Sequence, residues 1–144
     1  MSRQSEDLQH RAAEFARRIN ALCEKVPQTL AGRRISGQLI DAASAVSSNY
    51  RAACRGRSHA EFTAKIGTVA EEADETIGWL KLLESSGLLR ADQIEWELQE
   101  ANELTAIFAA SFKTARENER RRKPRRDQSP RRGQRDENER RRDT

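Results

Sequence analysis

Arginines in two stretches are the side chains of this sequence whose spacing best suits binding of a charged ligand. Arg51 and Arg55 stand four residues apart, which puts both on one face of a helix, and Arg57 follows them closely. Arg33 and Arg34 come earlier, near the start of the same predicted helix. Guanidinium groups in a row can each donate paired hydrogen bonds to phosphate oxygens. These five arginines are therefore the first candidates for a surface that binds nucleic acid.

A structural interpretation of the same arginines stays open. Carboxylates follow in the next predicted helix, at Glu71, Glu72 and Asp74, and could neutralise the arginines within one chain or between subunits. The direction of the guanidinium groups of Arg51 and Arg55 distinguishes the two interpretations. Pairing with Glu72 or Asp74 favours a scaffold for a partner protein, whereas free guanidinium groups favour phosphate binding.

The second candidate is the C-terminal segment 116–144, which contains no apolar residue, 13 Lys or Arg and 7 Asp or Glu. We expect this tail to be disordered because it has nothing to bury. Its most basic part, residues 120–126, is typical of arms that bind nucleic acid. The basic residues there are Arg120, Arg121, Arg122, Lys123, Arg125 and Arg126. A solvated tail without a ligand is the alternative.

Groups that could carry out catalysis are few and scattered. His10 and His59 fall on different predicted helices, and neither has a second metal ligand at a suitable spacing. Cys23 and Cys54 make no metal motif and no disulfide framework. The sequence has no glycine-rich phosphate loop and no Glu-x-x-His pair of the kind that builds di-metal sites in helical bundles. We therefore predict that the protein is not an enzyme and uses no cofactor or metal.

Composition sets the class of protein. All apolar residues lie within residues 1–115, which predicts one domain there, and the longest unbroken apolar run is residues 106–110. A membrane span needs about 20 apolar residues, so no span is expected. The N-terminal residues are polar and of mixed charge, without a secretory signal, and we expect a cytoplasmic protein.

Charge is distributed unevenly along the chain. Lys and Arg exceed Asp and Glu by five in residues 1–57, fall short of them by seven in residues 58–115, and exceed them by six in the tail. This asymmetry predicts an anionic partner, self-association, or both.

Four amphipathic helices must position these side chains. Apolar residues at steps of three and four predict helices over about residues 5–26, 28–55 and 58–86. They also predict a fourth helix that begins at about residue 91 and whose helical character fades beyond residue 116. Because the connections are short, neighbouring helices must run antiparallel, which gives an all-α, up-down-up-down four-helix bundle. Among the residues predicted to face inward are Phe15, Ile19, Leu39, Ile66, Leu80, Leu104 and Phe108.

Polar and glycine residues mark the helix ends. Ser5 is the expected N-cap of the first helix, and Ser58 with Glu61 forms a capping box at the start of the third. Gly56 and Gly87 are expected to end the second and third helices, since glycine accepts the left-handed conformation.

Some apolar residues fall outside the inward stripes. A bundle of this kind buries one stripe from each helix, which would leave Ile40, Tyr50, Trp79 and Trp96 as candidates for an oligomer interface. The alternative is that the helices pack asymmetrically and bury these residues within one chain.

Two runs in the sequence resemble a known family. Residues 34–53 have the pattern R-x-S-G-Q-x-x-x-A-x-x-x-V-x-S-N-Y-R-x-A, and residues 71–83 have the pattern E-E-A-D-E-T-x-x-W-L-x-L-L. In this order and spacing they resemble the "four helix bundle protein" family, whose founding members are proteins encoded in bacterial 23S rRNA intervening sequences. The resemblance covers about residues 8–115.

This resemblance implies a ring-like homopentamer without catalytic activity. It also brings in a similar bundle, the accessory variability determinant of diversity-generating retroelements, which uses a positively charged surface and binds nucleic acid and a reverse transcriptase. The implied partners are thus further copies of the chain, RNA or DNA, and a reverse transcriptase, with no membrane. The acidic second half of the body and the Arg-rich tail depart from the family pattern.

Together these observations predict a non-enzymatic, oligomeric bundle that binds nucleic acid, RNA in particular, through the arginines of the second helix and the tail. The alternative is a protein-interaction scaffold or accessory subunit with no direct role in nucleic-acid binding.

Overall fold

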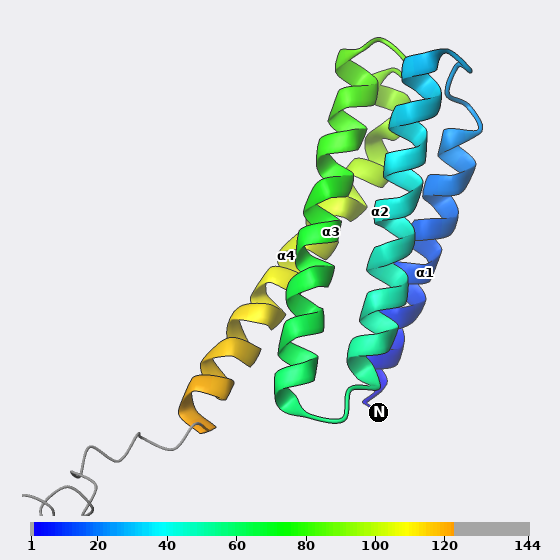
Figure 1. The fold of residues 1–144 in the computed structure, drawn as a ribbon. Coiled ribbons are helices and arrows are strands. Elements are labelled where there is room, and N and C mark those ends of the chain that lie inside the picture. The colour runs from blue at the N-terminus through cyan, green and yellow to red at the C-terminus, as the bar shows by residue number, and fades with distance from the viewer. Residues whose placement is uncertain (1, 123–144) are drawn as a thin grey trace, which may run out of the picture.

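The computed structural model of the protein describes residues 2–122, which form four helices in an antiparallel bundle (Figure 1). The helices are α1 (Arg3–Cys23), α2 (Leu30–Cys54), α3 (His59–Ser85) and α4 (Ala91–Arg122). Connections of only a few residues join them, so each helix runs antiparallel to the one before. The predicted all-α four-helix fold is confirmed. None of the helices in residues 2–122 is long and apolar enough to cross a membrane.

Side-chain caps begin the first three helices. Ser2 caps α1 by accepting a hydrogen bond from the Ser5 amide at 3.1 Å, so the expectation that Ser5 is the cap was wrong by three residues. The Ser58 hydroxyl accepts from the Glu61 amide at 3.1 Å, as the capping box requires. The Glu61 carboxylate, however, accepts from the Arg57 amide at 3.1 Å, one residue before the expected donor.

Glycine ends the third helix as expected, but not the second. Gly87 has a φ of 73°, and the amides of Gly87 and Leu88 donate to the carbonyls of Glu84 and Leu83 at 2.9 and 3.0 Å. This is the Schellman arrangement that closes a helix. Gly56 has no positive φ, which corrects the sequence prediction. Glycine fits there because a Cβ would lie only 3.1 Å from the Ala53 carbonyl oxygen.

The core is built from the predicted apolar stripes. Each helix buries one stripe, and the stripes of all four meet along the axis of the bundle. Seven of the large side chains predicted to face inward are fully buried: Phe15, Ile19, Leu39, Ile66, Leu80, Leu104 and Phe108. Four polar residues of the helices are buried as well and carry no apolar signal in the sequence: Ser36, Thr63, Thr76 and Glu97.

The four apolar residues predicted to lie outside the inward stripes have three different environments. Tyr50 belongs to the core, with 5% of its surface exposed and its ring centroid 5.0 Å from that of Phe108, so it offers no interface to a second chain. Ile40 and Trp79 are half-buried and pack against the core. Trp96 is 39% exposed, and the guanidinium carbon of Arg18 lies 4.1 Å from the centroid of its indole ring.

The contact between α1 and α4 is small and partly polar. α4 packs mainly against α3 and has few contacts with α1. The Arg11 guanidinium crosses this contact, donating to both oxygens of Glu100 at 2.5 to 3.1 Å and also pairing with Glu103.

The last helix is longer than the other three and leaves the bundle at one end (Figure 1). Ala115 is its last buried residue, but the helix continues without a break to Arg122. The domain boundary expected between residues 115 and 116 therefore falls inside α4. The disorder expected for the rest of the tail concerns residues 123–144, which lie outside the described residues.

Replacing Gly87 with alanine is expected to destabilise the protein by about 1–2 kcal/mol, because a Cβ is strained at a positive φ. The free energy of unfolding in urea measures the effect. Gly78→Ala is the matched control: it lies inside α3, where a Cβ would meet nothing within 4 Å, so it should stabilise the helix by about 0.5–1 kcal/mol. Equal effects of the two substitutions would contradict the assigned helix end.

Candidate nucleic-acid interface

One end of the bundle collects basic side chains. The start of α1, the connection between α2 and α3, and the C-terminal part of α4 all lie at this end (Figure 1). We call it the basic end, and its basic residues are Arg3, Arg51, Arg55, Arg57, Lys65, Lys113, Arg116, Arg120, Arg121 and Arg122. Five carboxylates share it, at Glu6, Asp7, Glu61, Glu117 and Glu119. Ten cations against five anions leave this end with a clear excess of positive charge.

The three arginines around the end of α2 are exposed. Arg51 lies in the last turn of the helix, Arg55 is its C-cap, and Arg57 lies in the connection to α3. Among residues 2–122, none of these three forms a salt bridge, and Glu72 and Asp74 are not their partners. The position of Arg51 also has a structural benefit, because a cation stabilises the negative end of the helix dipole.

The other two arginines of α2 do not belong to this group. Arg33 and Arg34 lie at the opposite end of the helix, and the 17 residues from Arg34 to Arg51 span about 26 Å at the helical rise. The expected surface of five arginines is therefore two separate groups. Both arginines are exposed; Arg33 donates to the Gln28 carbonyl at 3.2 Å, and Arg34 has no side-chain partner in the described part of the chain.

The end of α4 adds two basic residues that were not predicted to belong to a site, Lys113 and Arg116. Lys113, Arg116 and Arg120 follow one another at steps of three and four, so they share a helical face, and with Phe112 and Glu117 they line a hollow of about 340 Å³. The spacing was visible in the sequence, but the boundary set at residue 115 separated Lys113 from its neighbours. Arg120, Arg121 and Arg122 are exposed in the last turn. The predicted residues Lys123, Arg125 and Arg126 lie outside the described residues.

A histidine at the start of α3 contacts α4 just before the last turns of α4 leave the bundle. His59, the first residue of α3, is half-buried, and its Nε2 lies 2.9 Å from the carbonyl oxygen of Ala115 in α4. His59, Phe62 and Ala115 also line a hollow of about 320 Å³ between the two helices. The contact fixes where α4 leaves α3 and so positions the basic turn that follows.

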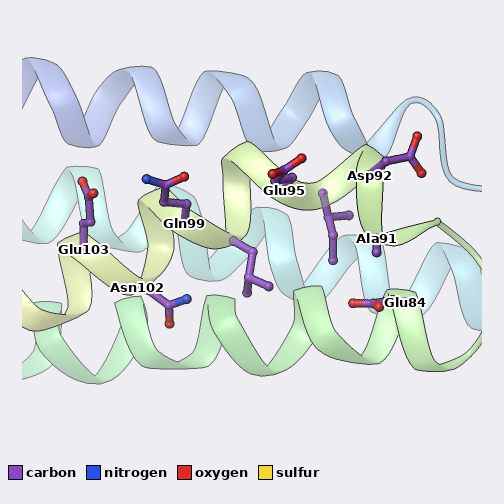
Figure 2. Close-up of a pocket in the computed structure, with 9 residues that line it drawn as sticks. Glu84, Ala91, Asp92, Glu95, Gln99, Asn102 and Glu103 are labelled. Atoms are coloured by element: carbon purple, nitrogen blue, oxygen red, sulfur yellow. The ribbon is translucent and has the colours of Figure 1, made fainter.

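An acidic hollow lies toward the other end of the molecule. It has a volume of about 590 Å³, and Figure 2 shows Asp92, Glu95, Gln99 and Glu103 projecting from α4 with Glu84 projecting from α3. Asp92 pairs with Arg90 and Glu103 with Arg11, and no basic residue lines the hollow itself. Four carboxylates would repel phosphate, which makes this hollow unsuitable for nucleic acid.

The acidic run of α3 also lacks basic partners. Partial burial raises the pKa of the Glu72 carboxyl, and the neighbouring carboxylates of Glu75 and Glu71 raise it further. These like charges lie on one helix without a salt bridge to any cation in residues 2–122. Within a single chain, therefore, the acidic run does not neutralise the arginines of α2.

Groups suited to catalysis are not assembled. Cys23 is buried, and burial raises the pKa of its thiol, while Cys54 is half-buried beside Tyr50. Burial, together with Cys54, raises the pKa of Tyr50 to about 12. No group of three His, Cys, Asp or Glu residues that could hold a metal ion occurs in residues 2–122.

Comparison with known proteins places the chain in a family. The model of the 23S rRNA-intervening sequence protein family matches residues 5–110, which is most of the chain and all of the bundle except the first two residues of α1 and the end of α4. The chain belongs to this family. No curated protein matches the chain.

A member of the S23 ribosomal protein family gives the structural comparison. The chain is similar to a crystal structure of a protein of unknown function from Bacteroides thetaiotaomicron, with 26% identity and a TM-score of 0.64. The match covers 73% of this chain and 97% of that one.

Substituting Glu72 by glutamine is expected to stabilise the protein at pH 7. The raised pKa means that the fold favours protonated Glu72, so the wild-type protein loses stability as the pH rises through that pKa, whereas glutamine stays neutral. Urea unfolding should show a gain for Glu72→Gln at pH 7 that disappears below about pH 4, where free carboxyl groups protonate. Glu75→Gln removes the neighbouring charge and should also stabilise the protein at pH 7. A gain that is equal at pH 4 and pH 7 would contradict this electrostatic origin.

Proposed function

We propose that the protein is a non-enzymatic oligomer that binds RNA through the basic end and the Arg-rich tail. The observation that carries the proposal is the set of exposed guanidinium groups at Arg51, Arg55 and Arg57, which have no carboxylate partner in residues 2–122. Unpaired guanidinium groups are free to bind phosphate and to release its counterions. The tail, whose residues 116–122 form the end of α4, carries further basic residues in its sequence from 123 to 144.

The distribution of charge supports phosphate binding on part of the surface only. The acidic hollow of α4 and the acidic run of α3 would repel a polyanion from those two faces of the bundle. A strand would therefore be attracted to the basic end in a defined orientation. Membership of a family named for 23S rRNA intervening sequences agrees with a role near RNA.

Oligomerisation would multiply this local charge. In the homopentamer that we propose, a ring of parallel bundles would present five basic ends on one rim. Several weak contacts on one strand then act together, because each later contact forms at high effective concentration. A modest number of arginines per chain is sufficient under these conditions.

The alternative function is a scaffold for a partner protein, such as a reverse transcriptase. The acidic hollow on α4, which presents four carboxylates over about 590 Å³, is the feature that favours this alternative, since it would suit a basic surface. In that case the basic end would contact neighbouring subunits instead of nucleic acid.

Neutralising the basic end should weaken RNA binding and its dependence on salt. A triple variant with Arg51→Gln, Arg55→Gln and Arg57→Gln should lower the slope of log K against log salt by about two, since each phosphate contact on a single strand contributes about 0.7. Fluorescence anisotropy of a labelled RNA at several salt concentrations measures the slope.

The matched control changes the net charge by the same amount at the opposite end of the bundle. Its three substitutions are Lys25→Gln, Lys81→Gln and Arg90→Gln, all at exposed positions. The control should bind RNA nearly as the wild-type protein does. Equal losses for both variants would show that only net charge matters, and absence of binding by the wild-type protein at low salt would reject RNA binding altogether.

The oligomeric state should be visible in solution without RNA. Light scattering of the full chain is expected to give five times the 16.4 kDa of one chain. Addition of RNA at low salt should raise the mass, and high salt should reverse the increase. An oligomer that ignores RNA at low salt would favour the scaffold function, and a monomer would contradict the ring.

A further inference from the structure

A hollow between α2 and α3, far from the basic end, combines an aromatic ring with two arginines. It has a volume of about 430 Å³, within the range of ligand sites. The residues that line it are Arg33, Arg34, Ile35, Gly37, Gln38, Asp41 and Trp79. All but Trp79 come from α2.

One of the residues of α2 that line the hollow, Gly37, has no side chain. A Cβ placed on Gly37 would meet nothing within 4 Å, so the space beside the indole of Trp79 is open. Trp79 is half-buried against the core, which holds its ring in place. Arg34 has no side-chain partner in the described residues, and Arg33 donates one hydrogen bond to the Gln28 carbonyl.

We propose that this hollow binds one unpaired base of single-stranded RNA. The base stacks on the indole of Trp79, and Arg33 and Arg34 bind the flanking phosphates. This proposal rests on the proposed function, RNA binding, and adds to it a preference for single strands. An aromatic ring next to cations is the combination that binds single-stranded nucleic acid, because bases stack on the ring while phosphates pair with the cations.

The polar residues of the hollow suit a base better than a free anion. Asp41 contributes a carboxylate to the lining, which would repel a phosphate placed in the hollow itself. The same carboxylate can accept a hydrogen bond from the amino group of a base, and the Gln38 amide can donate or accept. The phosphates are thereby directed to the exposed arginines at the edge.

The second tryptophan lacks these features and serves as an internal control. The guanidinium of Arg18 covers one face of Trp96 at 4.1 Å. Glu95 and Glu97 flank Trp96 in α4. A base would have to displace the cation and approach the acidic helix, so Trp96 is not expected to stack on RNA.

The position of the hollow sets a length requirement. It lies about 26 Å from the basic end along α2, so only a strand long enough to cross this distance can occupy the hollow and the basic end of the same chain together.

The test uses fluorescence of the two tryptophans separately. Trp96→Phe leaves Trp79 as the single tryptophan, and Trp79→Phe leaves Trp96. A ten-nucleotide oligoadenylate is expected to quench the first variant saturably and to leave the second unchanged. A ten-base-pair RNA duplex should bind the basic end without quenching Trp79, because its bases are already stacked and paired.

Two glycine substitutions separate occupation of the hollow from damage to the fold. Gly37→Leu, in the Trp96→Phe background, places a side chain in the hollow and should abolish the quenching and lower the affinity for oligoadenylate about tenfold. Gly78→Leu adds the same side chain at another open helical position that does not line the hollow. It should change neither the quenching of Trp79 nor the affinity for oligoadenylate.

The outcomes distinguish this proposal from the one on which it rests. Binding of oligoadenylate by anisotropy without quenching of Trp79 would overturn the base-binding hollow and leave RNA binding at the basic end intact. Equal quenching by duplex and single strand, or no effect of Gly37→Leu, would also overturn it. Absence of any RNA binding would overturn both proposals.

Discussion

Burial of one apolar stripe from each helix is the constraint on which the rest of the structure depends. The stripes meet in a single core, and short connections force each helix to run back along its neighbour. These two conditions fix which helix ends lie together. They bring the end of α2, the start of α3 and the exit of α4 to one place, and the basic residues of three separate segments thereby become one surface.

The unequal lengths of the helices have a functional consequence. α4 has 32 residues and α3 has 27, so at the helical rise α4 is longer by about 7 Å. Its last turns extend past the core, where no apolar partner is available, and they carry charged side chains instead. The contact of His59 with the Ala115 carbonyl marks the point at which packing ends and the basic extension begins. The extension therefore continues as helix beyond the packed part of the bundle, to Arg122.

The sequence predicted the fold well because the determining signals are local. Periods of three and four residues, a capping serine and a closing glycine act within a few residues, and the core followed from them. Two local signals were misplaced, the cap expected at Ser5 and the left-handed glycine expected at Gly56, and the other failures concern contacts between helices. Tyr50 resembled a surplus aromatic residue until the fold brought Phe108 of α4 against it, and the five arginines of α2 resembled one group although the length of the helix separates them.

The environments of Trp79 and Trp96 are the feature of the fold that could least be predicted from the sequence. Both lie outside the inward stripes, and both resembled interface residues. In the fold, Arg18 of α1 covers Trp96, whereas Trp79 faces a part of α2 where Gly37 contributes no side chain. The difference between a covered indole and an open one therefore depends on a single residue of a neighbouring helix in each case.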